Sequence, residues 1–362
     1  MSGKSIKLLF CIFIPILILL VPLSTFGIPG LTIVEQRIIA IFFMAALFWI
    51  LEPIPIYATS LLIIFLELVM VSNKGLIFLI KPSGTDAIGT LVDYKALIGT
   101  FASPIIILFL GGFFLAMAAT KYRLDQNLAK VLLKPFGQNP KWVMLGLMLI
   151  TATFSMFMSN TAATAMMLAI LAPVTAVFLD DDKGKIAFLL AIPFAANIGG
   201  IGTPIGTPPN AIALKYLTGS NYISFGKWMA MAIPYVIVLL IIIWILLLFL
   251  YPIKTDKIKL EINGTWLKTR KAIIVYITFA LTILLWLTDF LHGMNAYIVA
   301  MLPVVVFSAL DIINKSDLKN ISWDVLWLVS GGIALGLGLE ATGLAQHLID
   351  VIPFQEFSPI LI

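Results

Sequence analysis

Apolar runs long enough to cross a lipid bilayer follow one another along almost the whole chain. A membrane-spanning helix needs about 20 predominantly apolar residues. Runs close to this length lie near residues 6–21, 36–51, 54–72, 97–120, 228–251, 272–291, 295–313 and 323–344. Charged residues make up 11% of the chain, against about 25% in soluble domains, so the chain lacks the polar surface that a water-soluble particle needs. The sequence therefore predicts an all-α polytopic membrane protein.

The scarcity of reactive side chains argues against an enzyme. The chain has one cysteine, Cys11, and two histidines, His292 and His347, and we can assign no role to His347 from the sequence. Membrane-embedded catalysis would need a nucleophile with a general base, or a set of metal ligands. The net charge of +5 resides in short loops between apolar runs. We expect no catalytic residue, no organic cofactor and no nucleic-acid partner.

Two further apolar runs are too long for one helix, and the first is interrupted by a polar tip. Residues 142–178 carry Ser155 and the triplet Ser159-Asn160-Thr161 between apolar flanks. We interpret residues 137–178 as a re-entrant hairpin that enters and leaves the membrane on the same side. Irregular backbone at membrane depth survives only where it lines a cavity or is buried in protein. The alternative is that these polar residues only join helices to one another.

The second long run, 186–217, is interrupted at its centre by Gly206-Thr207-Pro208-Pro209-Asn210 and the residues before it. Three prolines and four glycines within residues 197–210 cannot continue a helix. We predict a discontinuous helix that presents backbone carbonyls, Thr207 and Asn210. The alternative is a kinked structural helix. Two interruptions in successive segments favour a binding site near the middle of the membrane.

The basic residues predict the orientation of the chain. With the hairpin returning to its side of entry, 17 of the 23 Lys and Arg residues fall on the side of the N-terminus. Cytoplasmic loops carry the excess of Lys and Arg. We therefore expect a multi-pass protein of the cell inner membrane with a cytoplasmic N-terminus.

A Gly-Gly motif recurs along the chain. Residues 110–116 align with residues 330–336 at an offset of 220, and both stretches contain a Gly-Gly pair. The two copies would leave opposite sides of the membrane, which indicates an inverted repeat typical of secondary transporters. The alternative is that glycine pairs only allow close helix packing.

The repeat predicts a division of the chain. It gives an N-terminal span and loop (residues 1–35), a first repeat (36–251), a cytoplasmic linker (252–271) and a second repeat (272–362). Within the first repeat we expect scaffold helices (residues 36–96), a gating helix (97–130), the re-entrant hairpin (137–178), the broken helix (186–217) and a last span (228–251). By comparison with the first repeat, the second should lack on the order of 100 residues.

The hairpin and the break together resemble the divalent anion/sodium symporter family over nearly the whole chain. The resemblance rests on Ser159-Asn160-Thr161 and on Gly206-Thr207-Pro208-Pro209-Asn210. It implies transport of dicarboxylates such as succinate, or of citrate, by a homodimer. It also implies a sodium site and a substrate site, built from Ser155, Ser159, Asn160 and Gly206 for sodium and from Asn160, Thr161, Thr207 and Pro208 for substrate.

Electrostatics supports sodium as the coupling ion. No Lys or Arg lies within residues 142–178 or at the break. A helix N-terminus stabilises an anion by about 0.3–1 kcal/mol, or up to ~2 kcal/mol when partly buried. A sodium ion about 5 Å from a carboxylate would add roughly 3 kcal/mol at an effective dielectric constant of 20. We therefore expect symport with sodium by alternating access.

Three alternatives to this function remain open. A related carrier could transport sulfate or phosphate, or exchange dicarboxylates without sodium, and a protein of another class would not transport at all.

Two acidic features are also open. Glu67 lies in an apolar run, where it is either functional or reaches out to the interface. Asp180-Asp181-Asp182 should form a solvated cytoplasmic turn.

Overall fold

A computed structural model describes residues 3–80, 87–175, 178, 181–217, 219–258 and 265–351. Within these ranges the regular secondary structure is helical, apart from an isolated bridge between Ser72 and Val92. Six stretches of the described chain are long and apolar enough to span a membrane. These are α1 (Gly3–Leu20), α2 (Ile33–Leu51), Tyr94–Lys121, α12 (Phe225–Leu250), α13 (Arg270–Leu287) and α16 (Trp323–Ala341). The prediction of an all-α polytopic membrane protein is confirmed.

The run expected as one span over residues 97–120 is interrupted. It consists of α5 (Tyr94–Gly99), a short 3₁₀ turn over Thr100–Ala102, and α6 (Pro104–Lys121). The interruption precedes Pro104, which has no backbone N–H to donate and favours the first turn of a new helix.

The chain forms two compact units. The first comprises residues 1–106 and 323–362, and the second comprises residues 107–322. This division follows spatial contacts and does not test the predicted repeats 36–251 and 272–362, which stay a prediction.

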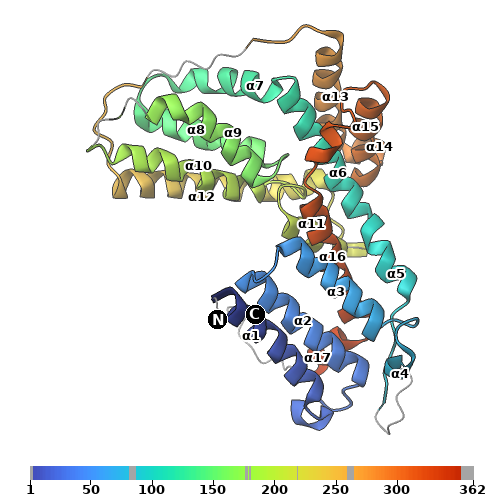
Figure 1. Cartoon of the computed structure of the whole chain (residues 1–362). Coiled ribbons are helices and arrows are strands. Elements are labelled where there is room, and N and C mark those ends of the chain that lie inside the picture. Colours follow the sequence, from blue (N-terminus) through green and yellow to red (C-terminus); the bar gives the residue numbers. More distant parts are fainter. Residues whose placement is uncertain are drawn as a thin grey trace. The chain divides into compact units, whose positions relative to one another are not determined.

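In the first unit, α2 packs between α1 and α3 (Ile56–Met70), drawn in blue in Figure 1. The unit also contains α4 (Ile77–Ile80) and the C-terminal helices α16 and α17 (Leu344–Val351). Helix α3 packs closely on α16, where a Cβ atom at Gly331 would lie 2.4 Å from the Cβ of Ser60. The glycine therefore permits this approach of the two helices.

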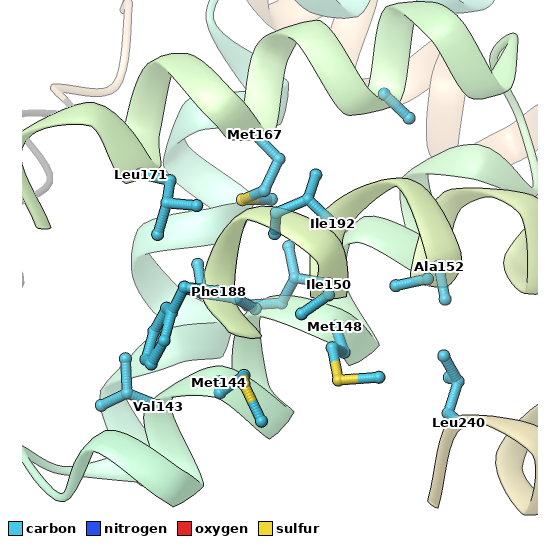
Figure 2. Packing of buried hydrophobic residues seen from close by; sticks show 14 of the residues in the cluster. Val143, Met144, Met148, Ile150, Ala152, Met167, Leu171, Phe188, Ile192 and Leu240 are labelled. Atoms are coloured by element: carbon cyan, nitrogen blue, oxygen red, sulfur yellow. The ribbon is translucent and has the colours of Figure 1, made fainter. Parts of the chain in front are cut away.

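The second unit is built around a bundle of α8 (Pro140–Ser155), α9 (Asn160–Thr175), α10 (Gly184–Gly200) and α12, which lie side by side in Figure 1. Its other described α-helices are α6 from residue 107 onward, α7 (Leu124–Leu133), α11 (Pro208–Tyr216), α13, α14 (Asp289–His292) and α15 (Ala296–Ala309). Figure 2 shows Met148 of α8, Met167 of α9, Ile192 of α10 and Leu240 of α12 in one buried cluster. This apolar core fixes the helices that carry the candidate site.

Two charged side chains of the first unit are buried. Glu67 is fully buried beside Gly338 of α16, which disfavours the alternative that it reaches out to the interface. Arg37, which the charge count placed on the side away from the N-terminus, is buried in α2. Its Nη1 donates to the carbonyl oxygens of Met70 at 2.7 Å and Leu79 at 2.8 Å, because a guanidinium can satisfy backbone carbonyls that the helix ends leave free.

The expected solvated turn at residues 180–182 is only partly exposed. Asp181 is exposed and pairs with Lys254, whereas Asp182 is buried and Asp180 lies outside the described residues. The carboxylate of Asp182 accepts hydrogen bonds from the backbone N–H groups of Gly184, Lys254 and Thr255. Burial alone would raise the pKa of Asp182, but these hydrogen bonds and one from the Thr255 hydroxyl lower it below its ordinary value. Asp182 therefore anchors the segment after α12 to the start of α10.

His347, for which the sequence indicated no role, joins two helices of the first unit. Its Nδ1 lies 3.1 Å from Glu35 Oε1 at the start of α2, and its Nε2 lies 2.7 Å from the carbonyl oxygen of Pro29. The hydrogen bond with Glu35, and then the one with Pro29, raise the pKa of His347 above its ordinary value. The protonated ring donates to both acceptors and holds α17 against α2.

Candidate functional site

The hairpin tip lies between α8 and α9. Helix α8 ends at Ser155 and α9 begins at Asn160. The N–H groups of Phe157 and Met158 both donate to the carbonyl oxygen of Phe154, at 2.9 and 3.0 Å, and close the turn. The Ser159 hydroxyl accepts from the N–H of Ala162 at 3.2 Å and caps the new helix.

A chain of polar side chains crosses three helices at this tip. The buried Ser155 hydroxyl donates to Asn160 Oδ1 at 2.7 Å. The amide of Asn160 donates in turn to Asn197 Oδ1 of α10 at 3.1 Å. Because each amide oxygen has two lone pairs, Asn160 and Asn197 retain acceptor capacity for a further ligand.

The second interruption separates α10, which ends at Gly200, from α11, which begins at Pro208. The amide of Asn210 donates to the carbonyl oxygens of Gly200 and Thr203, both at 2.9 Å, and so bridges the break. Trp228 of α12 supports it from outside, because its indole N–H donates to the carbonyl oxygen of Ile201 at 3.0 Å. The described backbone confirms that the helix predicted over 186–217 is discontinuous.

The two interruptions meet. A Cβ atom added to Gly200 would lie 2.7 Å from both Asn160 Oδ1 and Thr207 Cγ2, and one added to Gly206 would lie 2.2 Å from the carbonyl oxygen of Gly200. The Thr203 hydroxyl also donates to the carbonyl oxygen of Met156 in the hairpin turn. Glycine is needed at Gly200 because a side chain there would separate the hairpin tip from the break, and at Gly206 because a side chain there would push the broken segment away from the end of α10.

Other predicted site residues lie around this junction. Ser159 borders a cavity of about 210 Å³ whose lining also includes Thr120, Ala162 and Asn320. Thr161 is exposed in the first turn of α9, and Pro208 is the first residue of α11. The structure thus brings Ser155, Asn160, Gly206 and Thr207 together in one place, with Ser159, Thr161 and Pro208 at the adjoining helix starts.

Sequence reasoning did not include Asn197 or Thr203 among the candidate site residues. Asn197 hydrogen bonds to Asn160, and Thr203 hydrogen bonds to the hairpin turn. The available signal for Asn197 was an amide three residues before the helix end in an otherwise apolar segment. A polar residue in such a segment needs a partner, which here is the hairpin tip.

The junction offers two kinds of ligand group. Hydroxyl, amide and backbone carbonyl oxygens are ligands for hard cations. The N-termini of α9 and α11, which follow the two interruptions, carry partial positive charge that favours an anion. The arrangement can therefore hold a cation next to a carboxylate or another small anion.

Comparison with known proteins identifies the family. A profile of the citrate transporter family matches residues 46–362. The chain belongs to this family. The sodium-dependent dicarboxylate transporter SdcS of Staphylococcus saprophyticus is 32% identical to it, over 90% of this chain and 66% of SdcS. The resemblance to the divalent anion/sodium symporters is confirmed.

Two yeast relatives are also transporters by name. The inorganic phosphate transporter PHO87 of Saccharomyces cerevisiae is 29% identical, over 90% of this chain and 34% of PHO87. An uncharacterized transporter of Schizosaccharomyces pombe is 29% identical, over 86% of this chain and 35% of its own length. The chain thus spans between about a third and two thirds of these relatives' lengths. The family and these relatives are transporters, in agreement with the prediction that the chain is not an enzyme.

Proposed function

We propose that the chain takes part in sodium-coupled symport of a di- or tricarboxylate such as succinate, with its binding site where the hairpin tip meets the break between α10 and α11. The observation that carries this proposal is the close approach at Gly200, where a Cβ atom would meet Asn160 of the hairpin tip and Thr207 of the break. Residues 142–178 and 197–210 contain no Lys or Arg. Sodium would supply the positive charge that the side chains lack.

The proposed roles follow from the chemistry of each group. Sodium would be bound by oxygen atoms of Ser155, Ser159, Asn160 and Gly206. Gly206 would contribute its backbone carbonyl oxygen. Asn160, Thr161, Thr207 and Pro208 would contact the substrate carboxylate at the starts of α9 and α11. The hydrogen bonds from Ser155 to Asn160 and from Asn160 to Asn197 support this assignment, because they orient the shared residue Asn160.

The inverted repeat is part of the same proposal. Gly111 of α6 lies against Ala300 of α15, and Gly331 of α16 lies against Ser60 of α3. In each compact unit, the first glycine of a Gly-Gly pair therefore packs on a helix from the other predicted repeat. This reciprocal exchange supports two related halves that move against each other during alternating access.

The proposal has four further parts. The hairpin is re-entrant, the N-terminus is cytoplasmic, the chain lies in the cell inner membrane, and it assembles as a homodimer. The excess of Lys and Arg on the side of the N-terminus supports the orientation. The two apolar helices α8 and α9, joined by a short polar turn, support the hairpin.

Transport of inorganic phosphate is the second candidate, because PHO87 matches 90% of this chain. Phosphate and a carboxylate are both oxyanions that a helix N-terminus and a cation can bind. A sodium-independent exchange of dicarboxylates would need the same anion site without the coupling ion.

The test measures binding of succinate, citrate and phosphate to the purified chain in lipid nanodiscs, in sodium and in choline. We expect succinate or citrate to bind with higher affinity in sodium. Asn160→Ala should lower this affinity by about 5- to 150-fold, because two hydrogen-bond partners lose Asn160 at roughly 1–3 kcal/mol in total. Asn221→Ala, at an exposed position outside the hairpin tip and the break, is the matched control.

Each outcome decides between the candidates. Equal affinity in sodium and choline would contradict coupling and favour exchange. Sodium-dependent binding of phosphate without binding of succinate or citrate would select the phosphate carrier. Unchanged binding by Asn160→Ala would remove the junction from the site.

A further inference from the structure

An apolar groove runs along the first unit between α1 and α3, with α2 as its floor. Its volume is about 450 Å³, and every residue that lines it is apolar. The walls include Leu8 and Leu19 from α1 and Leu66 from α3, and the floor includes Ala40 and Met44 from α2. Helices α1 and α3 each pack on α2, so the groove follows the length of this three-helix face.

The length of the groove indicates its occupant. Leu8 and Leu19 are separated along α1 by about 16 Å, at 1.5 Å per helical residue, which is close to half of the ~30 Å hydrocarbon thickness of a bilayer. A span of half the hydrocarbon thickness is the reach of one extended acyl chain from one leaflet. Water has no polar partners there.

Positive charge lies at one end of the groove. Lys4, Leu8 and Ile12 follow each other at intervals of four residues, so they share one face of α1. Leu8 and Ile12 line the groove, and the exposed Lys4 continues the same stripe beyond its end. Lys7 is also exposed at this end, where its Nζ lies 3.3 Å from the carbonyl oxygen of Leu51.

Two exposed ammonium groups leave this end of the groove positive. Glu52 is the exposed acidic residue next to Leu51, so the two ammonium groups of Lys4 and Lys7 are balanced by one carboxylate there. At the far end, Arg37 is buried and donates to the carbonyl oxygens of Met70 and Leu79. Among the described residues near that end, the exposed cation is the single Lys74, four positions after Met70, so the charge favours a headgroup beside Lys4 and Lys7.

We propose that this groove binds an anionic glycerophospholipid from the membrane leaflet on the side of the chain's N-terminus. One acyl chain fills the space over Ala40 and Met44, and the phosphate lies between Lys4 and Lys7. The bound lipid fills a space that would otherwise lack packing contacts along α1, and so fastens α1 to α2 and α3.

The test is native mass spectrometry of the delipidated chain titrated with phosphatidylglycerol or phosphatidylcholine of identical acyl composition. We expect one tightly held phosphatidylglycerol per chain and weaker binding of phosphatidylcholine. Lys4→Gln and Lys7→Gln should each weaken phosphatidylglycerol binding by about 5-fold, as expected for basic residues at a membrane surface. Lys227→Gln removes an exposed charge elsewhere and should change nothing.

A second pair of variants tests the groove itself. Ala40→Phe fills the floor and should abolish tight binding of both lipids, whereas Ala169→Phe adds the same ring at an exposed position of α9 and should not. Equal binding of the two lipids by the unmodified chain would overturn the headgroup assignment. If Ala40→Phe and Ala169→Phe bind the lipids equally well, the groove assignment is overturned. It is also overturned if the bound mass equals a second copy of the chain and is lost with Ala40→Phe. The surface lysine variants keep the proposal testable if Ala40→Phe does not fold.

Discussion

Gly200 lies at the end of α10, where the hairpin tip and the helix break approach each other most closely. In Gly200→Ala, the new Cβ would lie 2.7 Å from Asn160 Oδ1 and 2.7 Å from Thr207 Cγ2. Asn160 would have to retreat by roughly 0.7 Å to reach an ordinary van der Waals separation. That displacement would stretch its 2.7 Å hydrogen bond from Ser155 beyond the normal range.

The expected loss can be estimated from the hydrogen bonds that Asn160 makes. It has one with Ser155 and one with Asn197, and each contributes about 0.5–1.5 kcal/mol. Losing both would cost about 1–3 kcal/mol, which lowers sodium affinity by about 5- to 150-fold. Alanine is also favoured over glycine in a helix by about 1 kcal/mol, so the fold itself should be retained.

The assay is the rise of the thermal unfolding midpoint with sodium concentration, since a ligand that binds the folded state stabilises it. Gly200→Ala should need about 5- to 150-fold more sodium for the same rise, with a similar midpoint in choline. Gly99→Ala is the control, because a Cβ at Gly99 would meet nothing within 4 Å. If Gly200→Ala responds to sodium as the unmodified chain does, Asn160 does not belong to the ion site.

Three further predictions concern packing and hydrogen bonds outside the site. Gly331→Ala should lower unfolding stability by about 1–3 kcal/mol, because its Cβ would lie 2.4 Å from the Cβ of Ser60; an unchanged unfolding midpoint would contradict this packing. Asp182→Ala should release residues 252–258 and speed their cleavage by protease, because three backbone N–H groups lose their acceptor; unchanged cleavage would show that other contacts hold the segment. The hydrogen bond with Glu35 raises the pKa of His347, so its stabilising contribution is complete below about pH 6.5 and is lost as pH rises through the raised value. The difference in midpoint between the unmodified chain and His347→Gln should therefore shrink with rising pH, and a constant difference would exclude the protonated ring as its cause.

Proline and glycine made the break between α10 and α11 predictable from the sequence. Pro208 and Pro209 lack the N–H that a continuing helix would need, and glycine disfavours helix in the residues before them. The structure has α10 end at Gly200 and α11 begin at Pro208, as this chemistry requires. The turn between α8 and α9 was predictable from the polar residues Ser155 and Ser159-Asn160-Thr161 between apolar flanks.

Contacts between distant residues could not be predicted in the same way. Asn197 lies 37 positions from its partner Asn160, and His347 lies 312 positions from Glu35. No local preference connects such pairs, because they depend on how whole helices pack. Arg37 shows the same limit, since counting it as a charge on one side of the membrane does not reveal that its guanidinium donates to the carbonyl oxygens of Met70 and Leu79.

The most direct measurement of the ion site uses one labelled cysteine at the hairpin tip. Cys11 is the chain's natural cysteine and is buried, so Cys11→Ser with Ala162→Cys places a single reactive thiol beside Ser159 at the exposed start of α9. We predict that sodium slows maleimide labelling of this thiol relative to choline, and that succinate with sodium slows it further. Labelling at the same rate in sodium, in choline and with succinate would contradict a sodium and carboxylate site at the junction.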